Sequence, residues 1–283
     1  MNYRSLLVLL AHDPLCIVRT RLAMLLARQF DCTLLGLAPT GMVDLPTSPA
    51  AAAALAHQAD GAWSQLYALA EQAARSFADE CRAVRFHSFE AIVDPAPHAE
   101  SLVRYAHCSD LVVLTQADPL SPEYVATRDQ VEHVVLHSAR PTLVLPYANG
   151  RGTFDTFGTR ALVAWDGSRE AGRALSDALP LLRRADAVQL VCWDEPGIDA
   201  EAMRARLQAV QGWLLRHRVR SEARLESAFG MGLADALLSH AAETGADLIV
   251  MGAYGRGRWA ERVLGGATRG LLGSMTVPVL MSR

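Results

Sequence analysis

Short apolar runs alternate with longer amphipathic segments along the chain, most clearly in its second half. Five apolar runs in that half predict strands: residues 160–165, 187–193, 221–228, 247–251 and 278–281. The amphipathic segments between them predict helices: residues 168–184, 199–217, 233–244 and about 265–274. Apolar strands joined by helices indicate a parallel sheet covered on both faces, and right-handed crossovers make such a sheet doubly wound. The pattern therefore predicts an α/β fold.

The chain contains an internal repeat. Three segments of the first half reappear in the second: 109–114 as 246–251, 140–144 as 277–281, and 9–13 as 162–166. The first two matches share an offset of 137 residues, whereas the third, nearest the start, has an offset of 153. The fall in offset predicts an insertion in the first half, most naturally in the Pro- and Ala-rich stretch 40–54. We expect two domains, residues 1–150 and 158–283, joined by a glycine- and threonine-rich linker near residue 152.

The last predicted strand of each half would lie at the edge of its sheet. An open edge exposes unpaired N–H and C=O groups to other chains. If residues 141–145 pair with residues 278–281, both edges are covered within one chain. We therefore expect an intrachain pseudo-dimer of the two halves, and a further homodimer of whole chains stays open.

A glycine-rich segment follows the strand predicted at residues 247–251. It begins Gly252-Ala253-Tyr254-Gly255 and continues to Gly265-Gly266. Glycine permits positive φ and removes the side chain that would hold a ligand away from the backbone, and the N–H groups at the start of the next helix bind anions. The segment therefore predicts a phosphate site. Because ligands of doubly wound sheets lie where the winding reverses, we expect Asp166, after the first strand of this half, to face this loop.

Two motifs together resemble the universal stress protein family in its tandem two-domain form. They are Val163-Ala164-Trp165-Asp166-Gly167-Ser168 and the spacing Gly252-x2-Gly255-x9-Gly265. The resemblance covers nearly the whole chain. It implies two tandem doubly wound domains, each a five-stranded parallel sheet of order 3-2-1-4-5, the adenine nucleotide alpha hydrolase-like fold. It also implies a role in the stress response, with ATP or a related adenine nucleotide as ligand, with or without Mg²⁺.

The same resemblance implies where the parts of a nucleotide would lie. Asp166 would contact the ribose, beside Ala164 and Trp165. Cys192 would lie near the adenine. Four glycines would wrap the phosphates or offer them backbone N–H groups: Gly252, Gly255, Gly265 and Gly266.

The candidate site also includes Met251 at the strand end and one arginine of the following segment, Arg256. Arg256 belongs to a group that could pair with phosphate or form a solvated helix face: Arg256, Arg258, Arg262 and Arg269. The family places Ser or Thr where this chain has Gly266. One hydroxyl is therefore missing, at a loss of about 1 kcal/mol for a neutral hydrogen bond. We expect the site to be weakened without being abolished.

The first half lacks these motifs. At the 137-residue offset, the three spaced glycines correspond to Thr115, Asp118 and Arg128. The carboxylate of Asp118 would repel phosphate. Pro14 and Leu15 replace the Gly-Ser that follows the strand-one aspartate in the second half. We therefore expect residues 1–150 to form a degenerate domain that does not bind nucleotide.

Composition narrows the functional classes. The net charge of −3 supplies no basic field for nucleic acid or an anionic membrane, and no apolar run approaches the ~20 residues of a membrane span. The five cysteines are scattered, which favours a reducing, cytoplasmic compartment. His133 and His137 have the spacing of metal ligands on a predicted helix, but no third ligand is evident, so a structural pair is favoured.

Motifs of catalysis are absent from the sequence: there is no Gly-x4-Gly-Lys loop, no nucleophile elbow and no His-Glu-x2-His helix. Asp166 could help to hold a metal, but no motif places a second carboxylate beside it. We expect a stress-response protein that is not a dedicated enzyme, with the nucleotide as a regulatory ligand and with unidentified protein partners. Two alternatives remain: a nucleotide-free interaction or structural module, which Gly266 favours, and a weak ATPase.

Overall fold

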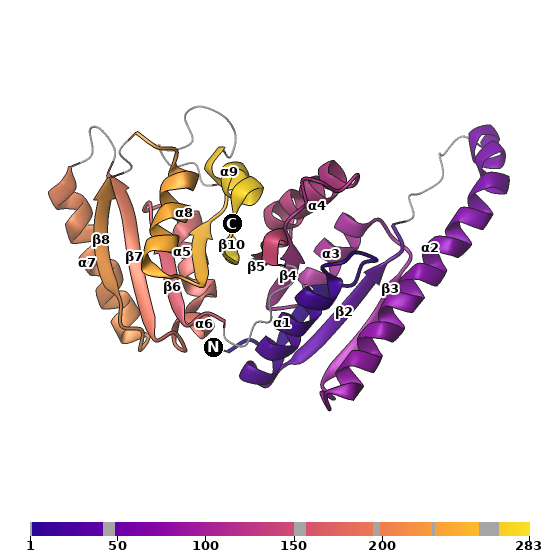
Figure 1. Cartoon of the computed structure of the whole chain (residues 1–283), viewed down its shortest axis with the longest axis horizontal. Coiled ribbons are helices and arrows are strands. Elements are labelled where there is room, and N and C mark those ends of the chain that lie inside the picture. Colours follow the sequence, from indigo (N-terminus) through magenta and orange to yellow (C-terminus); the bar gives the residue numbers. More distant parts are fainter. Residues whose placement is uncertain (1, 42–48, 150–156, 195–198, 228–229, 255–265) are drawn as a thin grey trace.

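The computed structural model describes residues 2–41, 49–149, 157–194, 199–227, 230–254 and 266–283, without the side chains of residues 49–60, 149, 194 and 267. Strands and helices alternate along both halves (Figure 1). The first half contains β1 (Ser5–Leu9), α1 (Cys16–Phe30), β2 (Thr33–Pro39), α2 (Pro49–Ala83), β3 (Phe89–Asp94), α3 (His98–Ala106), β4 (Leu111–Thr115), α4 (Tyr124–His137), β5 (Thr142–Leu145) and the 3-10 turn η1 (Tyr147–Asn149). The second half contains β6 (Arg160–Ala164), α5 (Arg169–Asp177), α6 (Leu179–Leu182), β7 (Ala187–Asp194), α7 (Ala200–Arg216), β8 (Glu222–Ser227), α8 (Leu233–Thr244), β9 (Leu248–Gly252), α9 (Gly266–Ser274) and β10 (Val279–Ser282).

The described strands form one sheet of ten, in the order β3-β2-β1-β4-β5-β10-β9-β6-β7-β8. Within each half the pairs are parallel and follow the predicted order 3-2-1-4-5. The two halves meet where β5 and β10 run antiparallel. The pairing of the last strands is confirmed, and it merges the two predicted five-stranded sheets into a single sheet.

Helices cover both faces of this sheet, because successive residues of each strand point to opposite sides. Leu6 and Val8 of β1 face one core, under α1, α2, α5, α6 and α7. Leu7 and Leu9 face the other core, under α3, α4, α8 and α9. Each core includes residues from both halves of the chain, so the apolar interior continues across the junction of β5 and β10.

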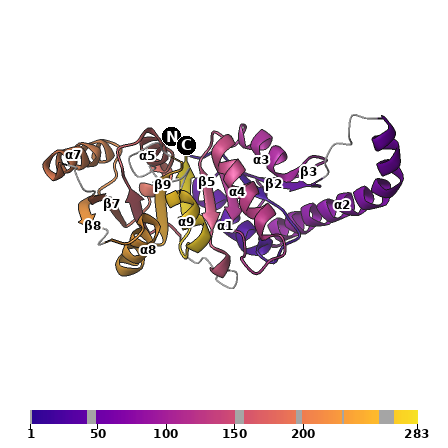
Figure 2. The ribbon, with the colours of Figure 1, turned by 90° about the horizontal axis from the view of Figure 1, so that it is seen from above.

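The insertion of the first half coincides with a long helix. Helix α2 has 35 residues, whereas its counterpart α7 has 17. Its C-terminal part packs on the sheet through buried residues such as Phe77 and Cys81. Its N-terminal turns extend past β3 and beyond the sheet (Figures 1 and 2). Among the described residues, no helix, α2 included, has both the length and the apolar character needed to cross a membrane.

One predicted helix is two. Residues 168–184 form α5 and α6, separated at Ala178, which ends the first and caps the second. Pro180 lies in the first turn of α6. Proline lacks the backbone N–H that a continuous helix would need at this position, so the chain restarts there. The prediction of a single helix was wrong for this reason.

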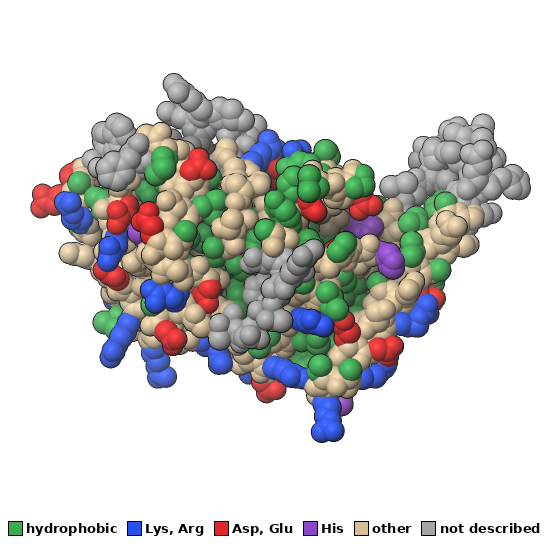
Figure 3. All heavy atoms as spheres, viewed as in Figure 1, with side chains coloured by type: hydrophobic (Ala, Val, Ile, Leu, Met, Phe, Trp, Pro, Cys, Tyr) green, Lys and Arg blue, Asp and Glu red, His purple; other side chains and the backbone are tan. Residues whose placement is uncertain are grey.

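Basic and acidic side chains are both spread over the face shown in Figure 3. This agrees with the near balance of 27 basic against 30 acidic residues in the chain. The visible face therefore carries no large field of one sign.

Candidate functional site

The carboxyl ends of β6 and β9 lie side by side in the second half, because these strands are neighbours in the sheet. A small cavity of about 50 Å³ opens there, lined by Ala164, Trp165, Asp166, Trp193, Leu233, Ala234, Leu237, Met251 and Gly252. Five of the predicted site residues meet in it: Ala164, Trp165, Asp166, Met251 and Gly252. Ligand pockets usually measure about 300–1,000 Å³, so this cavity alone is too small for a complete ligand site. Gly255, Arg256 and Gly265 lie outside the described residues.

Asp166 is held by the turn that starts helix α5. Its Oδ1 accepts a hydrogen bond from the N–H of Ser168 at 2.9 Å, and Gly167 between them has a φ of +77°. The Oγ of Ser168 then accepts from the N–H of Ala171 at 3.1 Å and caps the helix. The Asp-Gly-Ser sequence thus serves local structure first: aspartate and serine accept backbone N–H groups, and glycine supplies the positive φ. The half-buried carboxylate of Asp166 remains on the cavity wall.

Gly252 has a packing role that the sequence did not reveal. A Cβ at this position would lie 2.5 Å from the backbone N of Ala171 and 2.6 Å from the carbonyl carbon of Glu170. Only glycine lets the end of β9 approach the first turn of α5 this closely. Gly252 therefore lets the cavity lie directly beside the first turn of α5, and this packing role does not depend on a ligand.

Two tryptophans form the apolar wall of the cavity. The indole N–H of Trp165 is buried and has no hydrogen-bond acceptor among the described residues. Trp193 packs edge-to-face on the ring of His240, with ring centroids 6.2 Å apart, and the Nε2 of His240 lies 2.8 Å from the Oε1 of Gln189. A buried donor without an acceptor is costly, so the indole N–H of Trp165 has an unmet hydrogen-bonding requirement in the described part of the chain.

Cys192 is not brought to the cavity. It precedes Trp193 on β7 and so points to the opposite face, where it is 1% exposed in the core under α5 and α7. Its Sγ lies 3.7 Å from the carbonyl oxygen of Trp193. The structure therefore places Cys192 in one core, separated by the sheet from Ala164 and Met251, which face the other core.

Helix α9 supplies the other end of the glycine segment. Gly266 is its first residue, and a Cβ there would meet nothing within 4 Å. Thr268, which the sequence reading missed, is 3% exposed, and its Oγ1 accepts from the N–H of Tyr254 at 3.2 Å. This bond fixes the start of the glycine loop to the helix. Arg269 does not line the cavity, and it pairs with Glu132 of α4.

In the first half, a buried arginine bridges the equivalent strand ends. Arg19 is 2% exposed, and its guanidinium donates to the carbonyl oxygen of Leu9 at 2.7 Å, to Oγ1 of Thr115 at 2.6 Å and to Oδ2 of Asp13 at 2.9 Å. Asp13 and Thr115 are the counterparts of Asp166 and Gly252. The arginine therefore neutralises the carboxylate and bridges the ends of β1 and β4.

The counterpart of Arg19 in the second half is Gly172, at the 153-residue offset. A Cβ there would meet only the Trp165 ring, at 3.9 Å. Sequence periodicity offered a signal for Arg19, since it lies on the face of α1 that carries the fully buried Leu22 and Leu26. A cation on an apolar helix face indicates a buried partner. The motif comparison alone pointed instead to Asp118, whose Oδ1 accepts from the N–H of Leu120 at 2.9 Å in a turn.

His133 and His137 form a ring pair with centroids 4.4 Å apart. Burial lowers the pKa of His133, and His137 lowers it further. In the part of the chain that the structure describes, no three histidine, cysteine or carboxylate side chains gather as metal ligands would.

Known proteins share this architecture. Residues 159–283 match a family model described as the universal stress protein family. The structure of a universal stress protein from Archaeoglobus fulgidus DSM 4304 aligns with 99% of this chain and 96% of its own, with a TM-score of 0.63 and 16% identity. A functionally unknown protein from Pseudomonas aeruginosa PAO1 aligns with 99% of this chain and 92% of its own, with a TM-score of 0.59 and 18% identity. A protein of the universal stress protein family from Burkholderia pseudomallei is 33% identical and covers 44% of this chain and 94% of its own, with a TM-score of 0.32. A search of curated proteins returned no match.

Proposed function

The chain belongs to the universal stress protein family, and from this premise we propose that its second half binds one adenine nucleotide as a regulatory ligand while its first half binds none. The contrast between the two crevices carries the proposal. In the second half, Asp166 and Gly252 line one cavity, and the counterpart of Arg19 is Gly172, which has no side chain to bridge them. In the first half, the guanidinium of Arg19 bonds both counterparts of these residues, Asp13 and Thr115.

The residues of the second crevice suit the parts of such a ligand. The carboxylate of Asp166 can accept hydrogen bonds from ribose hydroxyls, and the indole N–H of Trp165 can donate to an acceptor on the base or sugar. The free N–H groups at the start of α9 favour phosphate, as helix N-termini do. Mg²⁺, where it accompanies the nucleotide, would rest mainly on the phosphates, because Asp166 is the one carboxylate that lines the described cavity. Binding then stabilises one conformation of the protein and needs no reaction.

The test is nucleotide binding by the whole chain. Native mass spectrometry of the purified protein is expected to detect one adenine nucleotide per chain, and excess Mg-ATP is expected to raise Tm. At about 100 times Kd, one bound ligand stabilises by roughly 2.7 kcal/mol, or about 5–10 °C. Asp166→Asn should reduce the rise strongly, because it keeps the acceptor for Ser168 and removes the charge. Gly255→Val should abolish it.

Asp118→Asn is the matched control. Asp118 accepts a backbone N–H two residues on through Oδ1, as Asp166 does, and both distances are 2.9 Å. This variant should keep the full rise in Tm. A protein without bound nucleotide that also shows no shift with millimolar Mg-ATP would refute the proposal.

A nucleotide-free interaction module is the second candidate function. The small cavity and the missing hydroxyl at Gly266 favour it. An unchanged Tm in Mg-ATP, together with an intact fold, is its expected signature. Slow ATP hydrolysis is the third candidate, and release of phosphate that stops in Asp166→Asn would support it.

We also propose a cytoplasmic setting and protein partners of the stress response. All five cysteines are free thiols. Burial raises the pKa of Cys32 and of Cys81 to about 11, so these two thiols stay protonated and unreactive at neutral pH. A reducing compartment fits this state.

A further inference from the structure

The junction of the two halves has the geometry of a two-fold axis. In the β5–β10 ladder, Leu143 pairs with Leu280, Val144 with Val279, and Thr142 with Met281. The repeat offset of 137 residues makes Leu280 the counterpart of Leu143. Thr142 and Val144 flank Leu143, and each of them pairs with the counterpart of the other. This reciprocal pattern around a residue that pairs with its own counterpart marks the two-fold axis of an isologous contact.

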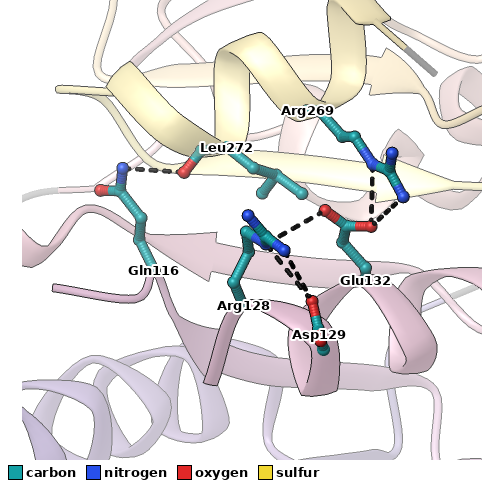
Figure 4. A network of polar contacts seen from close by, with 6 residues as sticks. All are labelled: Gln116, Arg128, Asp129, Glu132, Arg269 and Leu272. Carbon is teal, nitrogen blue, oxygen red and sulfur yellow. Dashed lines mark hydrogen bonds and ion pairs between the residues drawn. The ribbon is translucent and has the colours of Figure 1, made fainter. Parts of the chain in front are cut away.

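The same relation holds between the helices above this ladder. Arg269 of α9 binds Glu132 of α4, with both Nε and Nη2 3.0 Å from Oε2 (Figure 4). These two residues are also 137 apart, so each contacts its own counterpart across the pseudo-axis. The equivalent positions carry opposite charges. An unlike pair of halves therefore places a carboxylate against a guanidinium.

A pair of like halves would reverse this outcome. Two first halves would bring Glu132 against a second Glu132, and two second halves would bring Arg269 against a second Arg269. The Glu132 side chain is only 9% exposed, so a repelling neighbour would act with little screening by water. Arg128, whose Nε is 3.8 Å from the Oε1 of Glu132, belongs to the same half and would accompany it. It would offset part of the repulsion between two glutamates and none of that between two Arg269 side chains.

A second contact depends on a donor that the first half alone carries. The Nε2 of Gln116 donates to the carbonyl oxygen of Leu272 at 2.8 Å (Figure 4). The counterpart of Gln116 in the second half is Ala253, which has no donor in its side chain. Two second halves would therefore lose this bond as well.

We propose that the Glu132–Arg269 ion pair at the pseudo-axis favours pairing of the two unlike halves and disfavours pairing of like halves. The same charges disfavour pairing of like halves from two copies of this chain. The edge strands β5 and β10 are the surfaces through which either kind of pair would form. A first half that is folded before its partner is synthesised is thereby kept from pairing with the first half of another copy.

The first test is a charge-reversal cycle in the intact chain. Glu132→Arg and Arg269→Glu each place like charges on the axis and should lower Tm by at least about 2–4 °C. The double reversal restores opposite charges and should recover at least half of the lost Tm. The recovery is not expected to be complete, because Arg128 remains beside the new arginine at position 132. Arg75→Glu is the control, because it reverses one partner of the exposed Arg75–Glu71 pair on α2 and should leave Tm nearly unchanged. A double reversal as unstable as the sum of the single ones would overturn the proposal.

The second test measures selection directly. A protease site is introduced within residues 150–156, and the folded chain is nicked there, unfolded in urea and refolded by dilution. Native mass spectrometry should then detect pairs of unlike halves. The same nicked chain with Glu132→Gln and Arg269→Gln should also form pairs of like halves. Like pairs in the nicked chain with native charges, or their absence from the neutral variant, would overturn the proposal. If neither nicked chain refolds, the charge-reversal cycle decides.

Discussion

Two glycines of the candidate site differ in what surrounds them. Gly252 faces the backbone of α5 at distances that no Cβ tolerates, whereas Gly266 begins α9 with open space beside it. In the sequence both belong to one glycine-rich motif. In the structure, one is required for packing and the other is free to serve a ligand or the helix start.

We expect Gly252→Ala to lower the free energy of unfolding by about 1–3 kcal/mol, because the new methyl group forces β9 and α5 apart. Gly266→Ala should be neutral or stabilising by up to roughly 1 kcal/mol, since alanine favours the helix. Urea unfolding of the two variants measures the difference. Equal stability of both would show that the close approach at residue 252 is not needed.

Individual residues also show how far the sequence could predict the site. Asp166 and Gly252 meet as expected, because strand order alone brings the ends of β6 and β9 together. The bridging role of Arg19 was not predicted, since its partner Thr115 is 96 residues away in the chain. The position of Cys192 depends on which face of β7 the cavity occupies, and the motif does not specify the face.

At the scale of elements, helix α2 has two different environments along its length. Phe77 is 2% exposed and packs so closely on Gly36 of β2 that a Cβ there would lie 2.6 Å from its ring. Leu66, three turns earlier, is 37% exposed. The helix is therefore supported by the sheet at its C-terminal end and by its own hydrogen bonds farther out.

Alanine at these two positions should separate the environments. Phe77→Ala is expected to cost about 3–5 kcal/mol, because it leaves a cavity in the core. Leu66→Ala should change stability by less than about 0.5 kcal/mol. Chemical denaturation monitored by circular dichroism gives both values. A large loss for Leu66→Ala would indicate that the outer turns are packed against something in solution.

The hydrophobic pattern predicted the element boundaries well where strands are buried on both faces. It predicted them wrongly where a single residue ends a helix. Pro180 divides a predicted helix, although the helical pattern continues through it. The insertion was predicted from the repeat offsets, but its form was not. Alanine-rich sequence is compatible with a loop or a helix until its neighbours are known.

At the scale of the whole molecule, the two halves share one sheet and both cores. Beyond the β5–β10 ladder, the hydroxyl of Tyr3 donates to the carbonyl oxygen of Asp177 in the other half at 2.7 Å. Burial raises the pKa of Tyr3 far above its usual value, so the hydroxyl keeps its proton at any physiological pH. Besides the Arg269–Glu132 ion pair, the interface is thus built from apolar core and from hydrogen bonds such as that of Tyr3, which does not titrate near neutral pH.

We expect the chain to unfold in one cooperative transition. The calorimetric and van't Hoff enthalpies should agree, because neither half can unfold without exposing the core that it shares with the other. Tyr3→Phe should lower the free energy of unfolding by about 1 kcal/mol while keeping a single transition. Two resolved heat-capacity peaks in the native protein would contradict this expectation.

The pairing of Leu143 with Leu280 also has a genetic consequence. In a symmetric dimer, one codon encodes both sides of the axis, so every substitution meets its own copy. In this chain two codons encode the two sides, and the axis residues can differ, as Glu132 and Arg269 do. Such a junction can acquire complementarity in single mutational steps, each of which alters one side only.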